Sequence, residues 1–302
     1  MPINGLLYVF GERRGSDAVF IATSSRYGRL LFLTSEQALE RQQPEASRVF
    51  ARNTDLIRER IASLRGGGAA RVIVLPVPTK LSVFLATDPS LRAQVCGMQE
   101  AAQCDGGRTA AAYDRFAGVL RAEGASVVPL QRLLVTRAAT GDELLFAYED
   151  THWTSLGLNL AAAETAGAWR GEDATPPVTV GRLPDAPGDL QHMLALPDRP
   201  FFRTHRAEQD LYDLHASTPV AACSAPAVLL GTSYSRPGGQ RLATLLTQAT
   251  GCPVIDLSVD GDGPVASFHA LFAEHAGDLR GAVVIWEFPF RDLTDPRSFV
   301  GH

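Results

Sequence analysis

Apolar and polar residues follow one another along this chain in blocks whose lengths predict strands and helices in turn. Short continuous apolar runs, typical of buried strands, lie at 72–77, 126–130, 228–231, 254–257 and 282–288. Because these runs show no strict alternation of apolar and polar positions, they indicate strands of a parallel sheet that is covered on both faces.

Segments with apolar residues near helical spacing separate these strands. They lie at 45–64, 109–123, 155–169, 240–250 and 265–276. The third begins after Thr154, a residue favoured at helix N-caps, and ends at Gly171, a residue favoured just after helices. Alternating strands and helices are the pattern of a parallel α/β sheet. We therefore predict an α/β fold in a single domain over residues 1–302.

Three regions depart from this alternation. Residues 1–40 contain short strand-like runs with turn signals at 13–17 and 27–28, which predict a small β appendage at the start of the chain. Residues 78–107 are polar and predict a long loop with a function or a local helix of its own. Residues 171–224 are rich in proline, aspartate and arginine, and we interpret them as an irregular insertion, either a lid or a substrate-facing segment.

Composition narrows the class of protein. The chain has 302 residues, of which 45% are hydrophobic and 20% charged, as expected for a globular protein with a sizeable core. Its net charge of −5 argues against a nucleic-acid partner. No apolar run reaches the ~20 residues of a membrane span. The amino terminus lacks the features of a signal peptide, so either the protein is cytoplasmic or the chain lacks an export segment.

The four cysteines are Cys96, Cys104, Cys223 and Cys252. The first two bracket a short polar segment and could close it as a disulfide, which would suit an oxidising compartment. The alternative is four free thiols in a reducing compartment. No pair has the spacing of a zinc site, and the histidines also lack a metal-ligand spacing, so we expect no metal and no cofactor.

The first candidate for chemistry is Ser233, in the sequence GTSYS at 231–235. It follows a buried-strand run and precedes a predicted helix, so its hydroxyl would stand at the carboxyl edge of the sheet. Backbone N–H groups at a helix amino terminus can stabilise an anion there. The plain alternative is an ordinary serine and glycine turn after a strand.

The second candidate is the pair Asp150 and His152, which lies just before the predicted helix at 155–169 and after a short expected strand at 143–148. Residues i and i+2 of an extended segment lie on the same side, so Asp150 can reach the ring of His152. A hydroxyl, an imidazole and a carboxylate form a nucleophilic relay in any chain order. The alternative for His152 is a helix-terminal residue beside a polar aspartate.

Four segments in a fixed order carry a resemblance to a known family. They are DTHWT at 150–154, GTSYS at 231–235, DGDGP at 260–264 and IWEFPFRDL at 285–293. Together they resemble the alginate O-acetyltransferase family, whose members are periplasmic proteins that acetylate secreted polysaccharides. IVLPVPTK at 73–80 and DLQHML at 189–194 are similar to the matching intervals, so the resemblance covers roughly residues 70–293.

The resemblance implies a flavodoxin-like, three-layer, SGNH-hydrolase-like α/β domain. In ordinary SGNH esterases the serine block comes first and the Asp/His block last. The order in this chain is reversed, as in the circularly permuted arrangement of the family. The asparagine of the esterase GxND block has no equivalent, because residues 286–289 read Trp-Glu-Phe-Pro.

The resemblance also assigns roles to single residues. Ser233 matches the nucleophile, His152 the base and Asp150 the acid that orients the base. The oxyanion hole would be formed by the amide of Ser233 and that of Gly261 or Gly263 in the DGDGP turn.

Two further residues are candidates for substrate binding. Tyr234 adjoins the nucleophile and could stack on a sugar, or it could be a core tyrosine. Arg291 follows the last strand and could bind a planar acceptor such as a carboxylate, or it could form a salt bridge. Glu287 is expected to be structural.

We therefore expect an enzyme that moves an acetyl group through a serine intermediate to hydroxyls of a secreted polysaccharide in the periplasm. The resemblance implies a membrane-bound O-acyltransferase as the partner that supplies the acetyl group. One alternative is a carbohydrate esterase that uses the same three residues for deacetylation. A second alternative is a non-catalytic polysaccharide-binding or scaffold protein.

Overall fold

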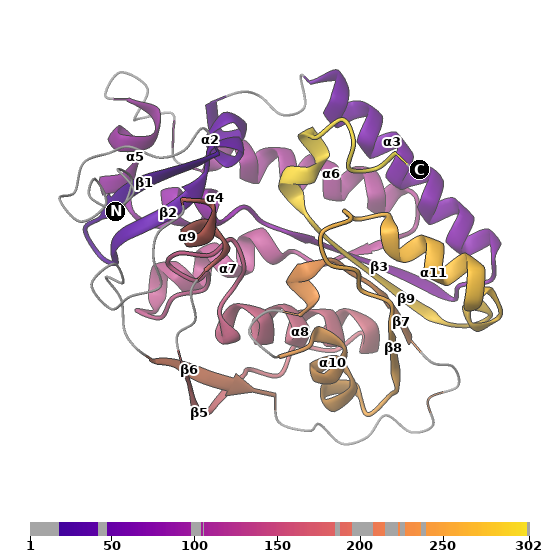
Figure 1. Cartoon of the computed structure of the whole chain (residues 1–302). Coiled ribbons are helices and arrows are strands. Elements are labelled where there is room, and N and C mark those ends of the chain that lie inside the picture. Colours follow the sequence, from indigo (N-terminus) through magenta and orange to yellow (C-terminus); the bar gives the residue numbers. More distant parts are fainter. Residues whose placement is uncertain are drawn as a thin grey trace.

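The computed structural model describes residues 18–41, 47–97, 104, 106–184, 188–194, 208–214, 223, 227–236 and 240–300. Its centre is a five-stranded parallel sheet with the strand order β4-β3-β9-β7-β8 (Figure 1). The strands are β3 (Arg71–Val77), β4 (Ser126–Val127), β7 (Ala227–Leu230), β8 (Val254–Asp256) and β9 (Val283–Pro289).

The strand order identifies a permuted flavodoxin-like topology. Counted from β7, the sheet strands are β7, β8, β9, β3 and β4, and their spatial order is then 2-1-3-4-5, that of the flavodoxin-like fold. In the chain itself, the strands of this sheet come in the order β3, β4, β7, β8 and β9, so the last two strands of the flavodoxin-like order come first. The prediction of a flavodoxin-like fold in circularly permuted order is therefore confirmed. The switch point of such a sheet, where ligands bind, lies between β7 and β9.

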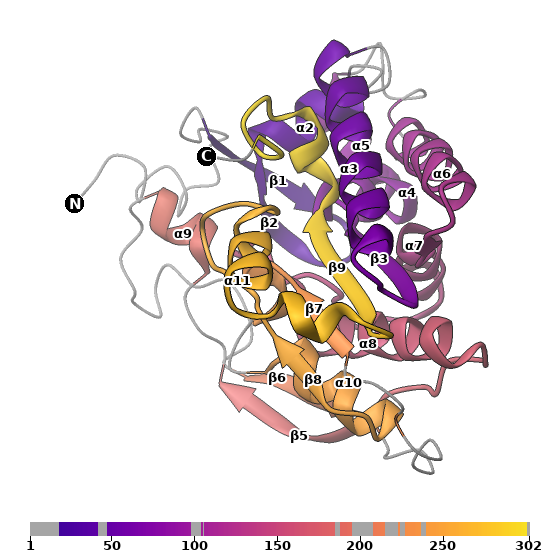
Figure 2. The same ribbon diagram turned by 90° about the vertical axis from the view of Figure 1, so that its right-hand side faces the viewer.

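Side chains on alternate strand positions separate the two faces of the sheet. In β9, Val284, Trp286 and Phe288 join one hydrophobic cluster, whereas Ile285 joins the other. The first cluster includes α3 (Arg48–Gly66), α6 (Gly107–Ala122) and α11 (Ala266–Glu274). The second includes α4 (Lys80–Thr87), α5 (Pro89–Cys96), α7 (Leu130–Thr140), α8 (Ser155–Arg170) and α10 (Leu242–Thr250). The sheet is thus the middle of three layers (Figure 2).

The start and end of α8 are as predicted. The Thr154 hydroxyl accepts a hydrogen bond from the amide of Gly157 at 3.3 Å, as an N-cap does. Gly171 follows the last turn with φ 74°, the left-handed conformation that glycine adopts without a steric penalty. This helix fixes the direction in which the segment before it, with Asp150 and His152, leaves the core.

The region 78–107 contains local helices, one of the alternatives that the sequence left open. Both α4 and α5 lie within it, and α4 is buried over most of its length, so it shows little of the amphipathic spacing that marks a surface helix. Two other local predictions were wrong. The expected strand at 126–130 has only two paired residues, because α7 begins at Leu130. The expected strand at 143–148 is reduced to one bridge, between Phe146 and Trp153.

Two small antiparallel pairs lie outside the central sheet (Figure 1). In the first 40 residues, β1 (Val19–Ser24) and β2 (Gly28–Leu33) form a hairpin, and α2 (Thr34–Arg41) follows. The turn expected at 13–17 lies outside the described residues. Within the region predicted as an irregular insertion, β5 (Val178–Pro184) pairs with β6 (Glu208–Asp213), and a short helix, α9 (Asp189–Met193), lies between them in sequence.

The cysteines form two disulfides. Cys96 pairs with Cys104, one of the two alternatives left by the sequence, and Cys223 pairs with Cys252 over a separation of 29 residues, which the sequence did not suggest. Helices long and apolar enough to cross a membrane are absent from the ranges described above.

Candidate active site

Ser233 stands on a single 3₁₀ turn directly after β7, at the carboxyl edge of the sheet. The turn is η3 (Ser233–Ser235), and the hydroxyl of Thr232 accepts a hydrogen bond from the amide of Tyr234 at its start. Gly231 is needed at the strand end, because a Cβ there would collide with the side chains of Ser235 and Ser258. The absence of a side chain at 231 lets the turn pack tightly against the loop after β8.

A buried carboxylate holds this turn from the neighbouring strand. Glu287 of β9 is fully buried and accepts hydrogen bonds from the Thr232 amide at 2.8 Å, the Thr232 hydroxyl at 2.9 Å and the Ser235 hydroxyl at 2.8 Å. Burial raises the pKa of Glu287 to about 7, although these donors favour the ionised form. The expectation that Glu287 is structural fits these contacts, and Ser233 lies between the two residues it holds.

His152 lies on a narrow loop, residues 147–152, that connects the two partners of the Phe146–Trp153 bridge, and α8 follows shortly after the bridge. The amide of Ala147 donates to the carbonyl of His152 at 3.0 Å, which closes the loop. Trp153 is buried, and its indole N–H donates to the carbonyl of Tyr234 at 2.8 Å. This bond joins the histidine loop directly to the serine turn.

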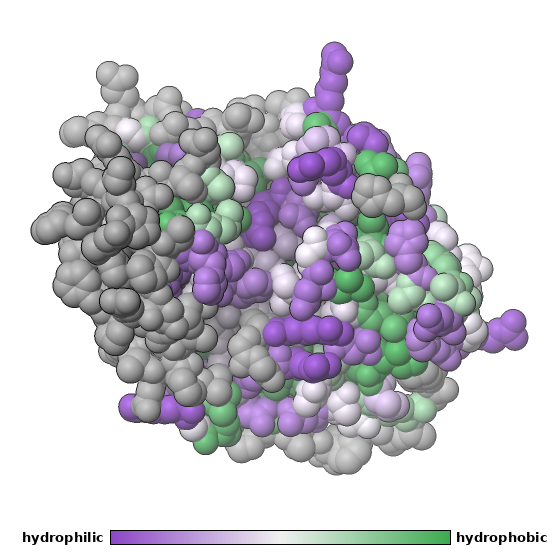
Figure 3. Space-filling model, viewed as in Figure 1, coloured by the Kyte–Doolittle hydropathy of each residue, from purple (hydrophilic) through white to green (hydrophobic). Residues whose placement is uncertain are grey.

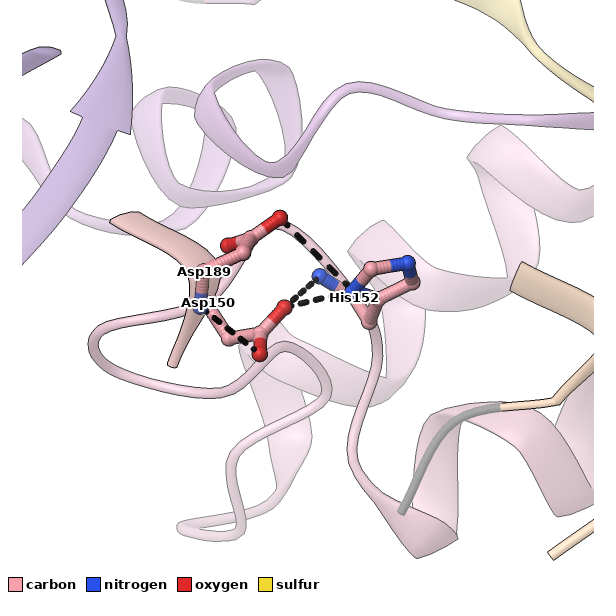
Figure 4. Close-up of side chains that lie close together, drawn as sticks. All are labelled: Asp150, His152 and Asp189. Atoms are coloured by element: carbon pink, nitrogen blue, oxygen red, sulfur yellow. Dashed lines mark hydrogen bonds and ion pairs between the residues drawn. The ribbon is translucent and has the colours of Figure 1, made fainter. Parts of the chain in front are cut away.

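The structure brings the three residues Asp150, His152 and Ser233 into one hydrogen-bonded line. Nε2 of His152 lies 2.8 Å from Oγ of Ser233, across 81 residues of sequence. Nδ1 of His152 lies 2.6 Å from Oδ1 of Asp150, which also accepts the backbone amide of His152 at 2.8 Å. Figure 4 shows the imidazole with Nδ1 toward the carboxylates and Nε2 turned away from them.

The charges within this line stabilise one another. Burial opposes ionisation of Asp150, but the hydrogen bond and charge of His152 outweigh it and hold the pKa of Asp150 well below its ordinary value. Burial likewise opposes protonation of His152, and the hydrogen bond and charge of Asp150 outweigh it and raise the pKa of His152. The arrangement therefore favours a carboxylate beside an imidazole that readily takes up a proton.

Tyr234 is a core tyrosine, the second of the two roles that the sequence left open, and it is not placed to stack on a sugar. Only 1% of the residue is exposed, and its ring packs against those of His152 and Trp153 with centroids 4.6 and 5.7 Å away. Its hydroxyl donates to the carbonyl of Thr151 at 2.8 Å. Within η3 the side chain of Tyr234 is buried, whereas that of Ser233 is partly exposed. Adjacency in sequence therefore did not imply a shared environment.

Arg291, on the 3₁₀ turn η6 (Phe290–Thr294) after β9, contacts the hydroxyl and the ring of the same tyrosine. Its Nη1 donates to the Tyr234 hydroxyl at 2.6 Å and lies 3.7 Å from the buried carboxylate of Glu36. Burial opposes the charged form of Arg291, but the interaction with Tyr234 and the charges of Asp292 and Glu36 outweigh it and raise the pKa of the guanidinium. The side chain keeps 20% exposure, and its role in substrate binding stays a prediction.

The loop that carries Gly261 and Gly263 lies next to the serine turn. The amide of Val259 donates to the carbonyl of Gly231 at 3.0 Å, and the indole of Trp286 in β9 donates to the carbonyl of Pro264 at 2.9 Å. Both glycines have left-handed backbones, with φ 84° and 76°. The contacts place the loop at the same sheet edge as Ser233; the oxyanion role of these amides stays a prediction.

A second acidic residue, Asp189 of α9, lies beside the pair of Asp150 and His152 and was not among the predicted site residues. Its Oδ2 lies 3.8 Å from Nδ1 of His152 (Figure 4). Asp150, His152 and Asp189 could in principle share a metal ion, since donor atoms of all three lie within 4.8 Å of one another. These atoms already bond to one another and to Thr151 within the protein, which argues against such a use. Asp189 is 39 residues beyond Asp150, and only the resemblance at 189–194 pointed to its segment.

The face of the molecule seen in Figure 3 is hollowed near its middle, and hydrophilic residues line much of the hollow. In the same orientation, Figure 1 shows that the carboxyl end of β9 and the turn after it face this part of the molecule. The candidate site residues are themselves partly exposed: 20% of the His152 side chain and 24% of that of Asp150 are accessible. A polar substrate can therefore approach them from solvent.

Comparison with known families identifies a matching domain over most of the chain. Residues 30–290 match the family described as SGNH hydrolase-like domain, acetyltransferase AlgX. Two curated relatives are each named probable alginate O-acetylase AlgJ. That of Azotobacter vinelandii is 29% identical over 202 residues, 60% of this chain and 50% of the relative. That of Pseudomonas fluorescens is 31% identical over 186 residues, 55% and 44% respectively. The chain thus spans about half the length of these curated relatives.

Two solved structures share the fold. The O-acetyltransferase domain of Pseudomonas putida AlgJ is 24% identical with a TM-score of 0.63, covering 91% of this chain and 92% of that one. Pseudomonas aeruginosa AlgX is 18% identical with a TM-score of 0.60, covering 93% of this chain and 65% of that one. At these identities the likeness shows the fold alone.

Proposed function

The chain belongs to the AlgX family of SGNH hydrolase-like acetyltransferase domains, and from this premise we propose that it acetylates a polysaccharide through an acetyl-serine intermediate. The observation that carries the proposal is the line from Asp150 through His152 to Ser233, with contacts of 2.6 and 2.8 Å. A hydroxyl aligned in this way with an imidazole and a carboxylate is the arrangement that acyl transfer through serine requires.

In the acylation half-reaction, neutral His152 accepts the proton of Ser233 at Nε2 while Oγ attacks the acetyl carbonyl of the donor. Asp150 holds the ring by Nδ1 and stabilises the imidazolium that forms. The negative oxygen of the tetrahedral intermediate would be bound by the amides of Ser233 and of Gly261 or Gly263. The intermediate collapses as the carbon–leaving group bond breaks, and the leaving group takes the proton from His152.

In the transfer half-reaction, a sugar hydroxyl takes the place of the leaving group. His152 accepts the hydroxyl proton while the sugar oxygen attacks the acetyl-serine carbonyl, and the proton then returns to Oγ of Ser233 as the new ester departs. A water molecule in place of the sugar would give acetate instead. Transfer therefore depends on the acceptor excluding water from the partly exposed histidine.

The relatives named alginate O-acetylases support a secreted polysaccharide as the acceptor. A membrane-bound O-acyltransferase that presents the acetyl group is the partner we infer from the family resemblance. The periplasm is the compartment that fits, because the two disulfides form and persist in oxidising surroundings.

Mass spectrometry after incubation with 4-nitrophenyl acetate tests the intermediate. We expect a mass gain of one acetyl group on the peptide that contains Ser233, and its loss in Ser233→Ala. Ser63→Ala, at an exposed serine of α3, is the matched control and should acylate as the parent protein does. Acetylation of any other residue in its place would contradict the mechanism.

Product analysis with an added oligosaccharide separates transfer from hydrolysis. Acetylated sugar that forms at the expense of acetate supports the transferase, whereas undiminished acetate and no acetylated sugar would identify an esterase. A scaffold role would appear as polysaccharide acetylation in cells that survives Ser233→Ala.

A further inference from the structure

Helix α9 is built against the loop that carries the candidate base. Gly188, the residue before this helix, lies so close to the loop that any side chain there would collide with the backbone of Glu149. The amide of Gln191 donates to the carbonyl of Glu149 at 3.2 Å. On its other side, α9 buries Leu190 and Leu194 against the β1–β2 hairpin. The helix therefore fills the space between the hairpin and the loop.

The side chain of Asp189 fastens this contact. One carboxylate oxygen accepts the backbone amide of Thr151 at 2.7 Å, and the other accepts the Thr151 hydroxyl at 2.5 Å. The backbone amide of Asp189 donates to Oδ2 of Asp150 at 3.2 Å. Three hydrogen bonds thus connect Asp189 to Asp150 and Thr151, the two residues immediately before His152. Asp189 bonds to Oδ2 of Asp150, whereas Oδ1 of Asp150 bonds to Nδ1 of His152.

The carboxylate of Asp189 also acts on the imidazole through its charge. At 3.8 Å from Nδ1 it is too far for a hydrogen bond but close enough for a strong attraction to an imidazolium. The charged and titratable groups around His152 are Asp150 and Asp189, which favour its protonation, and Arg291, which opposes it; the phenol of Tyr234 packs on the ring. Burial and the charge of Asp150 raise the pKa of Asp189 itself.

We propose that Asp189 is a positioning residue for the acyl transfer: it fixes the loop of Asp150 and His152 and places a second negative charge beside the base. This inference rests on the proposed function for its catalytic meaning. It explains why a short helix from the 171–224 segment is packed into the site.

Two substitutions separate the charge from the fastening. Asp189→Asn keeps an oxygen that can accept the Thr151 amide but removes the charge, whereas Asp189→Ala removes both. Asp114→Asn on α6, where the side chain is 66% exposed, is the matched control for loss of one negative charge. An NMR titration of the His152 ring measures its pKa without requiring turnover, so it is independent of whether the proposed function holds.

We expect the His152 titration to move to lower pH in Asp189→Asn and to stay in place in Asp114→Asn, because only the former loses a negative charge beside the ring. For Asp189→Ala we expect kcat/KM for 4-nitrophenyl acetate to fall on the order of 10- to 100-fold, since the loop loses its fastening. Asp189→Asn should lose less.

A His152 titration that coincides in the parent protein and in folded Asp189→Asn would overturn the inference. So would an Asp189→Ala variant with unchanged kcat/KM. The proposed function fails by a different result, namely acylation that persists in Ser233→Ala, and that result leaves the titration experiment intact.

Discussion

The two partners of the 2.8 Å contact between His152 and Ser233 are held in place by different means. Ser233 follows its strand after two residues, and a carboxylate from the adjacent strand, that of Glu287, bonds to the residues around it. His152 lies on a loop outside the sheet, and the contacts that hold this loop come from elements distant in sequence. The serine side is therefore fixed by the sheet itself, whereas the histidine side depends on side-chain contacts added around it.

Lys80 shows how the histidine side is held. Its ammonium group is buried and donates to the carbonyls of Leu31 at 2.8 Å, Tyr148 at 2.8 Å and Asp150 at 3.1 Å. One side chain thus ties the hairpin to both ends of the segment that leads into His152. The β1–β2 hairpin, predicted as an appendage, supports the candidate site, since its backbone shares this donor with the loop.

The largest effect is expected from breaking the pair on the histidine side. In Asp150→Asn the side chain is neutral, so it cannot compensate the charge of the imidazolium even where its oxygen accepts a hydrogen bond from Nδ1–H. We therefore expect a loss of about 10⁴-fold in kcat. The pKa of His152 should also fall, because Asp150 is the main group that raises it. The acid limb of the rate profile, where His152 must lose its proton to act as a base, then moves to lower pH.

Steady-state rates from pH 5 to 8 measure both effects. Asp114→Asn is again the control for a surface carboxylate. If Asp150→Asn kept more than about a tenth of the activity, Asp150 would not be the group that orients the base.

The next largest effect is expected at Lys80. Lys80→Met leaves three carbonyls without this donor and removes one of the two cations, Lys80 and Arg291, that lie near the buried carboxylate of Glu36. Removing a partner of a buried charge typically costs about 3–5 kcal/mol of unfolding free energy, and because Arg291 remains beside Glu36 we expect a loss toward the lower end of this range. Urea denaturation measures the loss.

Adding Glu36→Gln to Lys80→Met tests the charge part of that loss, because it removes the carboxylate that Lys80 and Arg291 balance together. The double variant should be more stable than the sum of the two single losses predicts. Strict additivity would show that Lys80 acts through its carbonyl contacts alone. Lys80→Arg should also destabilise, since a planar guanidinium does not direct donors at three carbonyls as a compact ammonium does.

On the serine side, a smaller effect is expected from Glu287→Gln. An amide nitrogen would face donors that now bond to a carboxylate, and bonds to charged groups are worth about 1.5–3 kcal/mol each. The native pKa of Glu287, about 7, lies above the ordinary value of 4.5. The folded state therefore binds a proton that the unfolded state releases, and this contribution to stability is full below pH 4.5 and is lost as the pH rises through 7.

Urea unfolding of both proteins at pH 5, 6, 7 and 8 isolates this term. The advantage of the parent protein over Glu287→Gln should shrink as the pH rises and level off above pH 7. A constant difference across this range would show that the carboxyl group does not change its proton occupancy on folding.

The contrast between the two sides also explains how much the sequence could predict. Ser233 and the strands around it follow from local pattern: an apolar run, a glycine, small residues and a helix. The permuted strand order followed from the order of the four resembling segments. Pairing of β3 with β9 over more than 200 residues, by contrast, joins the first and the last strand of the central sheet and has no local signal.

The contacts that hold the histidine loop were out of reach of local pattern. Asp189 lies in a segment without clear periodicity, and nothing near it in sequence indicates that it meets Thr151. Lys80 did carry a signal, since it is the only lysine among the 28 basic residues of the chain. A single lysine among arginines at a strand end suggests a place where a compact ammonium is required.

The smallest effect is expected from Tyr234→Phe, which removes a hydroxyl that connects the serine side of the site to the histidine side. Its hydroxyl accepts from Arg291 at 2.6 Å and donates to the carbonyl of Thr151 at 2.8 Å, so it joins the serine turn to the histidine loop. Phenylalanine keeps the ring packed on His152 and loses only these bonds, for which we expect about 1 kcal/mol of stability and a few-fold loss in kcat. Tyr234→Ala, which also empties the ring position, should cost about 3–5 kcal/mol. A Tyr234→Phe variant of parental stability whose KM for the sugar acceptor alone rises would instead mean that the hydroxyl reaches substrate, and that the tyrosine opens toward solvent during the reaction.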